Sequence, residues 1–173
     1  MQNRRTFTLR AAQAALAIAA PVGLTACGFK LKGAVQLPFQ SLYFDAAAKG
    51  PVAIVLRKQL QASTGLQLIS NAAQMPQAQL RLKVLRDEQA RSVVNANTYG
   101  LALEVKLFVF FYFQLLDDHG DPVGAPIELE QRRNLNYNES TPLAKGAEEQ
   151  MLYTDMNQDL AQQVMRRLAA VHL

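Results

Sequence analysis

Few side chains in this sequence could perform catalysis. The 173 residues include one cysteine, two histidines and no tryptophan. His119 lies in a run of aspartates and glycine that is typical of a turn, and His172 is the penultimate residue. Neither histidine has a neighbour that would orient it as a general base, and no serine lies in a G-x-S-x-G sequence. We therefore predict no catalytic residue and a protein that is not an enzyme.

The acidic residues do not form a recognisable metal site. Asp117, Asp118 and Asp121 lack the spacing of a calcium-binding EF-hand loop, so a solvated hairpin turn is their expected role. Glu148 and Glu149 are expected in the first turns of a helix, where carboxylates complement the helix dipole. A single cysteine excludes a disulfide framework and a cysteine-rich zinc site. The sequence predicts no metal and no bound cofactor.

Basic side chains are the remaining candidates for ligand binding. Four of them are expected on one face of a β-sheet, and a fifth, Lys145, stands at the start of the last predicted helix. A cluster of this kind could bind the phosphates of an anionic glycolipid through charge-assisted hydrogen bonds. Ordinary solubilising charges are the alternative interpretation. The four strand residues are Arg81, Lys83, Lys106 and Arg132.

The lone cysteine, Cys27, ends a segment that has the layout of an export signal. Arg4, Arg5 and Arg10 precede a short Ala-rich apolar stretch over residues 11–24. This stretch is shorter than the roughly 20 apolar residues of a transmembrane helix. The sequence L-T-A-C that ends at Cys27 is similar to the lipobox of bacterial lipoproteins.

The lipobox implies a particular processing of the N-terminus. By this resemblance, residues 1–26 are a signal peptide that is removed, the Cys27 thiol receives a diacylglycerol, and the new amine receives an acyl chain. Several acyl chains give stable anchoring, because each buried CH₂ contributes about 0.8 kcal/mol. Gly28, rather than an Asp, follows the cysteine, which favours lipid anchoring on the periplasmic side of the outer membrane. Export by the Sec route and by the twin-arginine route both stay open.

The positive charge of the chain belongs largely to this removed segment. The whole sequence has 18 Lys and Arg against 14 Asp and Glu. Without Arg4, Arg5 and Arg10, 15 basic residues remain against the same 14 acidic ones. A nearly neutral mature chain predicts no nucleic-acid partner, and an anionic ligand would have to be held by a local cluster.

The elements that must position these residues follow a tether. Residues 27–40 are predicted to form a lipidated tether and residues 41–173 a single α/β sandwich domain. Helical periodicity follows Gly50-Pro51 and recurs over residues 143–170. The order β-α-β-β-β-α predicts an α+β fold with two helices packed on one face of a mixed sheet of about four strands. The predicted strands cover residues 41–45, 78–86, 99–117 and 123–137, with a short extended segment possible at 67–69 and a polar connection at 91–98.

The longest predicted strand has one apolar face and one mixed face. Two helices can cover only one face of the sheet, so Phe108, Phe110 and Tyr112 are expected on the uncovered face. Burying a large aromatic side chain contributes roughly 1.5–3 kcal/mol, and an exposed apolar patch usually marks a protein or membrane contact. The three aromatic residues are therefore a candidate partner interface. Strand twist or the tether could instead cover them.

Several motifs occur in a fixed order along the chain. They are C-G-F-K-L-K-G from Cys27, the Arg86-Asp87 pair, the long strand from Tyr99, N-L-N-Y-N, L-A-K-G-A-E-E-Q-M and a closing Q-Q-V-M-R-R-L. Together they resemble the LptE family of lipopolysaccharide (LPS) assembly lipoproteins, formerly called rare lipoprotein B. The resemblance implies that the outer-membrane β-barrel LptD is the partner, with the lipoprotein as a plug in the barrel lumen that also aids barrel assembly. It further implies LPS binding during delivery to the cell surface, and a fold of two helices on a four-stranded sheet.

The resemblance also implies particular ligand contacts. A Lys in the family's A-L-A-K stretch is associated with LPS contact, and P-L-A-K places that role here on Lys145. A second family contact is an Arg in the loop before the long strand. This chain has Arg91 nearby but no clear match in that loop.

Two other functions stay open from the residues alone. One is a periplasmic lipoprotein hydrolase, which would need a histidine held by a carboxylate beside a serine. The other is a stand-alone structural lipoprotein that forms a homodimer through the sheet face of Phe108.

Overall fold

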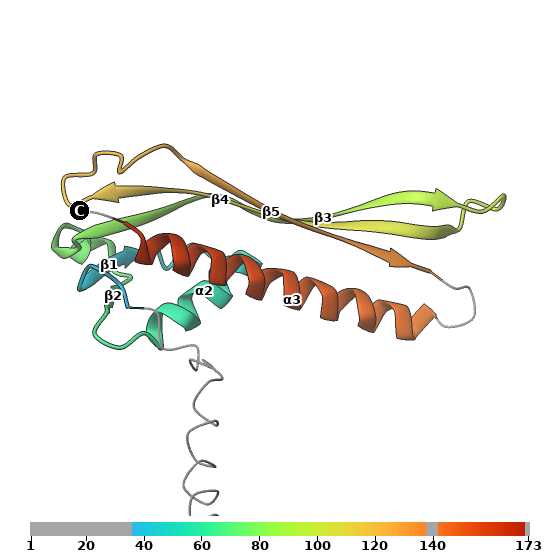
Figure 1. Ribbon diagram of the computed structural model, residues 1–173, viewed down its shortest axis with the longest axis horizontal. Coiled ribbons are helices and arrows are strands. Elements are labelled where there is room, and N and C mark those ends of the chain that lie inside the picture. The colour runs from blue at the N-terminus through green and yellow to red at the C-terminus, as the bar shows by residue number, and fades with distance from the viewer. Residues whose placement is uncertain (1–35, 138–141, 172–173) are drawn as a thin grey trace, which may run out of the picture. The chain divides into compact units, whose positions relative to one another are not determined.

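The computed structural model describes residues 36–137 and 142–171 (Figure 1). The predicted signal peptide at 1–26, Cys27 and the tether as far as residue 35 lie outside the described residues. The segment 138–141 and His172 lie outside them as well. Within the described ranges, no helix is long and apolar enough to cross a membrane.

The sheet has five strands, which are β1 Ser41–Phe44, β2 Gln67–Ile69, β3 Leu80–Ala96, β4 Ala102–Asp117 and β5 Ile127–Asn136. Their order across the sheet is β2-β1-β3-β4-β5. β1 is parallel to β2 and β3, whereas β3, β4 and β5 form an antiparallel meander. The predicted α+β class is confirmed. The predicted count of about four strands is corrected to five, because the three-residue segment β2 pairs with β1.

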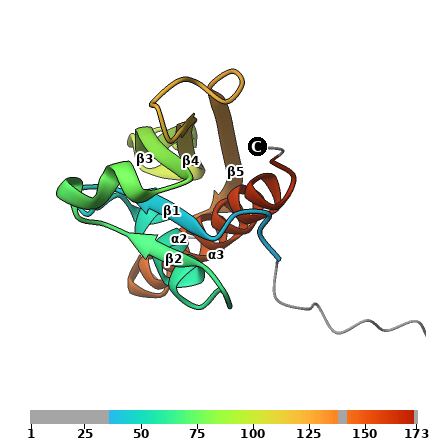
Figure 2. The same cartoon turned by 90° about the vertical axis from the view of Figure 1, so that its left-hand side faces the viewer.

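Two α-helices, α2 Pro51–Gln61 and α3 Pro142–Ala169, cover one side of this sheet (Figures 1 and 2). α2 begins with Pro51, which suits the first position because no hydrogen bond from its nitrogen is needed there. α3 ends with Arg166 and Arg167 in its last turn, where cations complement the helix dipole. The helices thus lie where the periodicity predicts them. A short 3₁₀-helix, η2 Ala72–Gln77, connects β2 to β3.

The core lies between the helices and the inward face of β4. Every second residue of β4 from Val105 to Leu115 is buried, which confirms the predicted apolar face. The opposing residues of α3 recur every four positions and are fully buried; they are Met156, Leu160, Val164 and Leu168. Because each such side chain contributes roughly 1.5–3 kcal/mol on burial, this layer fixes α3 along the sheet.

β3 continues well beyond the strand that its apolar alternation predicts. Residues 91–98 are predicted as a polar connection, but β3 pairs with β4 as far as Ala96. The side chains of β3 after residue 87 are exposed, so no apolar pattern marks this half of the strand. Backbone pairing with β4, rather than burial of side chains, keeps it extended.

One extra residue in β3 changes which side chains face the helices. The register with β4 shifts between Val84 and Arg86, which makes Leu85 the additional residue of a bulge. Such a shift exchanges the faces of the side chains that follow, here as far as the next register shift after Val93. Asp87 therefore points toward α2, where its carboxylate accepts hydrogen bonds from the amides of Val52 (3.2 Å) and Ala53 (2.8 Å).

Candidate ligand and partner surface

The register of the antiparallel strands decides which predicted site residues share a face. Residues directly opposite one another in neighbouring strands point to the same side. Arg81 lies opposite Leu116, Lys83 opposite Gln114, Lys106 opposite Asn134, and Arg132 opposite Phe108. The side that α2 and α3 leave uncovered, here called the open face, therefore carries Arg81, Lys83, Lys106, Phe108, Phe110, Tyr112 and Arg132.

The four basic residues of the open face do not form one cluster. The distance between Lys83 and Lys106 can be judged along β4, because Lys83 lies opposite Gln114 of that strand. Gln114 and Lys106 are eight residues apart, which is roughly 27 Å at about 3.4 Å per residue. Arg132 pairs with Glu130, with Nε 3.1 Å from Oε1. Arg81 and Lys83 therefore form a pair of cations near the start of β3, distant from Lys106.

The aromatic residues of the open face are half-buried by their own neighbours. The rings of Phe108 and Phe110 stack with centroids 5.9 Å apart and an interplanar angle of 4°. The guanidinium carbon of Arg86 lies 4.3 Å from the centroid of Phe110, which is a cation–π contact. Arg86 also pairs with Glu88 at 2.9 Å. Phe108, Phe110 and Tyr112, here called the aromatic strip, are thus bordered by charged side chains from β3 and β5.

Lys145 is not brought to the open face. It belongs to α3, which packs on the opposite side of the sheet. Its Nζ donates a hydrogen bond to Oε2 of Glu148, 2.7 Å away and one turn along the helix. This carboxylate compensates a lysine that stands at the helix end where the dipole disfavours a cation.

Arg91 takes part in a polar network between β3, β5 and α3. Its Nε lies 3.5 Å from Oε2 of Glu149, and its guanidinium carbon lies 5.3 Å from the centroid of Tyr137. The Tyr137 hydroxyl donates to the same Glu149 oxygen at 2.6 Å, and this bond is the main reason why the pKa of Tyr137 is raised. Tyr153 donates to the carbonyl of Ala90 at 2.9 Å, and burial raises its pKa. The network ties the exposed half of β3 to α3.

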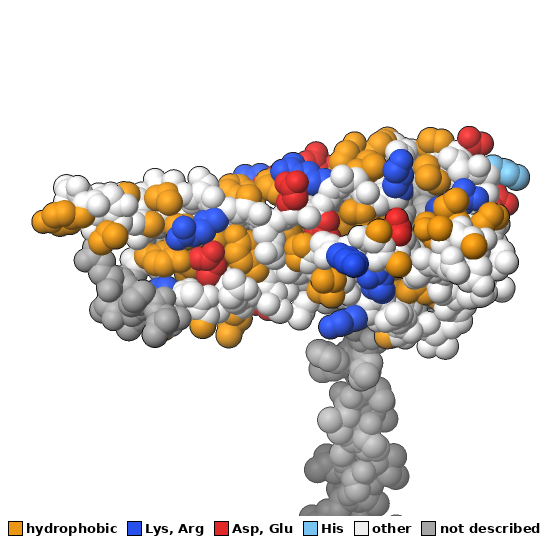
Figure 3. All heavy atoms as spheres, turned by 180° about the vertical axis from the view of Figure 1, so that it is seen from behind, with side chains coloured by type: hydrophobic (Ala, Val, Ile, Leu, Met, Phe, Trp, Pro, Cys, Tyr) orange, Lys and Arg blue, Asp and Glu red, His pale blue; other side chains and the backbone are white. Residues whose placement is uncertain are grey.

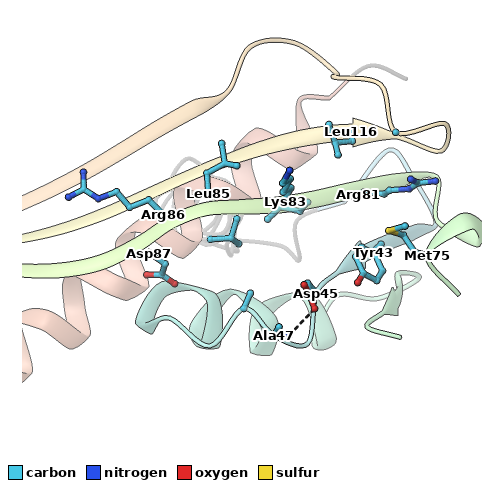
Figure 4. Close-up of a pocket in the computed structure, with 14 residues that line it drawn as sticks. Tyr43, Asp45, Ala47, Met75, Arg81, Lys83, Leu85, Arg86, Asp87 and Leu116 are labelled. Atoms are coloured by element: carbon cyan, nitrogen blue, oxygen red, sulfur yellow. Dashed lines mark hydrogen bonds between the residues drawn. The ribbon is translucent and has the colours of Figure 1, made fainter. Parts of the chain in front are cut away.

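A groove with a volume of about 580 Å³ opens beside the first half of β3 (Figure 4). Of the predicted site residues, Arg81 and Lys83 line it. The other residues that line it were not apparent from the sequence, because they come from several elements: β1, the β1–α2 loop, η2, β3 itself and the end of β4. They include Tyr43, Asp45, Met75, Leu85, Arg86 and Leu116.

The outer end of the β3–β4 hairpin carries a second group of exposed hydrophobic side chains. Seen from behind, hydrophobic side chains gather at that end, and basic side chains lie among hydrophobic ones toward the opposite end (Figure 3). The exposed residues near the hairpin turn are Val93, Val94, Tyr99 and Leu101, and Tyr99 is 89% exposed. A contiguous apolar patch on a protein surface commonly marks a contact with a protein or a lipid.

The turn between β4 and β5 supports no catalytic arrangement. Nε2 of His119 lies 3.6 Å from Oδ1 of Asp118, and both side chains are largely exposed. Asp117 closes the turn by accepting hydrogen bonds from the amides of Asp121 (2.8 Å) and His119 (2.9 Å). These bonds, chiefly the one from Asp121, lower the pKa of Asp117. Over residues 36–137 and 142–171, no group of three or more His, Cys, Asp and Glu side chains could hold a metal ion.

Comparison with known proteins assigns the chain to a family. The family model described as "LptE: Lipopolysaccharide-assembly" matches residues 34–168. The LPS-assembly lipoprotein LptE of Yersinia pestis is 30% identical over 149 residues, which cover 84% of this chain and 70% of the relative.

Solved structures of lipoproteins have a similar fold. Lipoprotein B from Nitrosomonas europaea matches with a TM-score of 0.69 and 28% identity, over 83% of this chain and 91% of that one. A minor lipoprotein from Acinetobacter baumannii matches with a TM-score of 0.60 and 27% identity, over 78% of this chain and 94% of that one. Since the family model spans most of the sequence, this chain belongs to the LptE family of LPS-assembly lipoproteins.

Proposed function

We propose that this LPS-assembly lipoprotein partners and plugs the LptD β-barrel, aids its assembly, and binds LPS during delivery to the cell surface. Cys27 carries the diacylglycerol and the N-acyl chain that hold the protein on the periplasmic side of the outer membrane. Membership of the LptE family supports this role. The family serves LPS assembly rather than catalysis, and no cofactor is expected for it.

The observation that carries the partner assignment is the composition of the open face. Phe108, Phe110 and Tyr112 lie beside Arg86 and Arg132 on a sheet face that neither α2 nor α3 covers. Aromatic and arginine side chains are the residues that protein interfaces enrich, with polar groups at the rim. A barrel wall that covers this face would bury the aromatic strip and leave the charged border in contact with polar groups.

Affinity capture from outer membranes tests the partner. The full lipidated chain with a C-terminal tag should recover LptD. The double substitution Phe108→Asp/Phe110→Asp should recover several-fold less, because it places unpaired carboxylates in an apolar contact. Ile54→Asp is the matched control: Ile54 is 45% exposed on α2 and should leave recovery unchanged. If the wild-type chain recovers no LptD, the partner assignment is rejected.

A second experiment tests Lys145 as an LPS contact. Lys145→Asp should weaken LPS binding by the lipidated chain, because it replaces a cation with an anion at the family position. Glu148→Gln removes only the ion pair of Lys145 and should bind LPS at least as well as the wild type. Unchanged binding after Lys145→Asp would remove this lysine from the site.

A further inference from the structure

We infer that the groove beside the first half of β3 binds the phosphate-bearing headgroup of an anionic lipid, with Arg81 and Lys83 as the phosphate contacts. The inference rests on the proposed LPS binding and assigns one part of it to a defined site. That site lies at the β1 end of the open face, distant from Lys106 and on the other side of the sheet from Lys145.

The groove exists because β1 and β3 separate. They pair only from Leu42 opposite Leu80 to Phe44 opposite Leu82, after which β1 turns toward α2 and β3 continues to Ala96. The wall formed by the β1–α2 loop is held in place by Arg57. Its Nη2 donates to the carbonyls of Asp45 (2.7 Å) and Ala48 (3.0 Å). A volume of about 580 Å³ between fixed walls is in the range of preformed ligand sites.

Arg81 is positioned as an anion contact by the turn between β4 and β5. Its Nη2 donates to the carbonyl of Asp118. Gly120 lies so close that a Cβ there would be 3.3 Å from Nη1. Nε of Arg81, in contrast, is buried and has no hydrogen-bond partner among the described residues. The bond to Asp118 thus orients the guanidinium, whose positive charge would attract an anionic oxygen in the groove.

Lys83 supplies a second cation at a suitable spacing. It is two residues along β3 from Arg81 on the same face, roughly 7 Å away. It is exposed, and no carboxylate in the described part of the chain forms an ion pair with it. A guanidinium and an ammonium at this spacing can contact different oxygens of one phosphate group.

Two carboxylates that also line the groove, those of Asp45 and Asp87, accept hydrogen bonds from backbone amides. Oδ1 of Asp45 accepts from the amide of Ala47 at 2.8 Å, as the dashed line in Figure 4 shows. Asp87 accepts from the amides of Val52 and Ala53 at the start of α2. Arg86 at the far end is paired with Glu88. Both carboxylates of the groove keep their negative charge, so Arg81 and Lys83 would bind a phosphate through direct contacts rather than through a net positive charge of the groove.

The remaining lining favours a lipid over a small free anion. Tyr43 and Met75 lie together on the η2 side, and Leu85 and Leu116 lie on β3 and β4 (Figure 4). Tyr43 and Met75 pack in a small apolar cluster with Ile69. A ligand with both a phosphate and an apolar part would match the two cations and this lining together, whereas inorganic phosphate would use only the cations.

Equilibrium binding by the full lipidated chain in non-ionic detergent tests the site, with LPS, dephosphorylated LPS and inorganic phosphate as probes. Lys83→Glu should weaken LPS binding about tenfold, and Arg81→Gln should weaken it similarly. Lys58→Glu, which changes an exposed lysine on α2, should leave it unchanged. Dephosphorylated LPS should bind the wild type about tenfold more weakly, with no further loss in Lys83→Glu. Millimolar phosphate should not displace LPS.

The outcomes separate this inference from the proposed function. Wild-type binding of LPS that survives undiminished in Lys83→Glu and Arg81→Gln would overturn the inference alone. Full displacement of LPS by inorganic phosphate would also overturn it, because the site would then serve a free anion. If the wild type binds no LPS, the proposed LPS binding fails and this inference fails with it. Because Lys83 is exposed, its substitution keeps the test valid even if Arg81→Gln unfolds.

Discussion

At the residue scale, Gly50 and Asp87 show how a helix is capped by a neighbouring strand. Gly50 precedes α2 and offers no side chain to cap it, so the amides of Val52 and Ala53 bond to Asp87 instead. The approach is close, since a Cβ on Gly50 would lie 2.2 Å from the carboxyl carbon of Asp87. The contact therefore requires glycine at position 50 for space rather than for its backbone angle.

Substitution of Gly50 tests this contact. Gly50→Ala should lower the free energy of unfolding by about 1–3 kcal/mol, because the added methyl group must displace the carboxyl group or α2. Urea denaturation of residues 28–173, expressed without the lipid anchor, measures the change. In an Asp87→Gly background the same substitution should cost less, because the clashing side chain is gone. Equal costs in both backgrounds would show that the close approach does not matter.

The ionisation of Asp87 gives a pH-dependent prediction. Burial raises the pKa of Asp87 above 3.8, and this effect outweighs the lowering by the two amide hydrogen bonds. The native state thus binds the proton more tightly than the unfolded chain does. The stabilisation from protonation is complete below pH 3.8 and is lost as pH rises through the native pKa. The free energy of unfolding of the wild type minus that of Asp87→Asn, measured by urea titration, should therefore fall as pH rises from 3.8 through the native pKa of Asp87. A rise of this difference would contradict a raised pKa for Asp87.

At the scale of elements, the bulge at Leu85 decides which side chains in the second half of β3 face the helices and which face the open side. Deletion of Leu85 would remove only the extra residue, so Val84, Arg86 and Asp87 could stay opposite Phe113, Tyr112 and Phe111 and keep their present faces. We therefore expect the deletion to retain cooperative thermal unfolding followed by circular dichroism. Deletion of Ala125, in an exposed stretch between β4 and β5, is the control for shortening the chain and should retain it as well. Loss of the cooperative transition in the Leu85 deletion alone would show that the fold requires the bulge itself.

The same elements show what could be predicted from the sequence. β4 and both helices were predictable because each buries one face, which leaves an apolar period. The outer half of β3 was not, since its exposed side chains carry no such period, and neither was the bulge, whose residues have no distinctive type. The open face followed from counting the helices available to cover the sheet. The groove could not be foreseen, because Tyr43, Met75 and Lys83 meet only through the pairing of β1 with β3.

At the scale of the whole molecule, the proposed ligand residues and the proposed partner residues lie in separate places. Arg81 and Lys83 line the groove near the end of β4, the aromatic strip occupies the middle of the open face, and Lys145 belongs to α3. A protein that both contacts a barrel and binds a lipid can use such separated surfaces at the same time. The proposed LptD contact and the proposed headgroup site should therefore respond to different substitutions.

The proposed lipid anchor gives a prediction for where the whole molecule resides. Cys27→Ser should abolish incorporation of labelled palmitate, because the thiol that carries the diacylglycerol is absent. Gly28→Asp should keep the lipid but move the protein to the inner-membrane fraction, since the residue after the cysteine governs sorting in the bacterial lipoproteins that this N-terminus resembles. Gly28→Ser is the matched control and should stay in the outer-membrane fraction on a sucrose gradient. Palmitate labelling that persists in Cys27→Ser would place the lipid elsewhere, and Gly28→Asp in the outer membrane would refute the sorting argument.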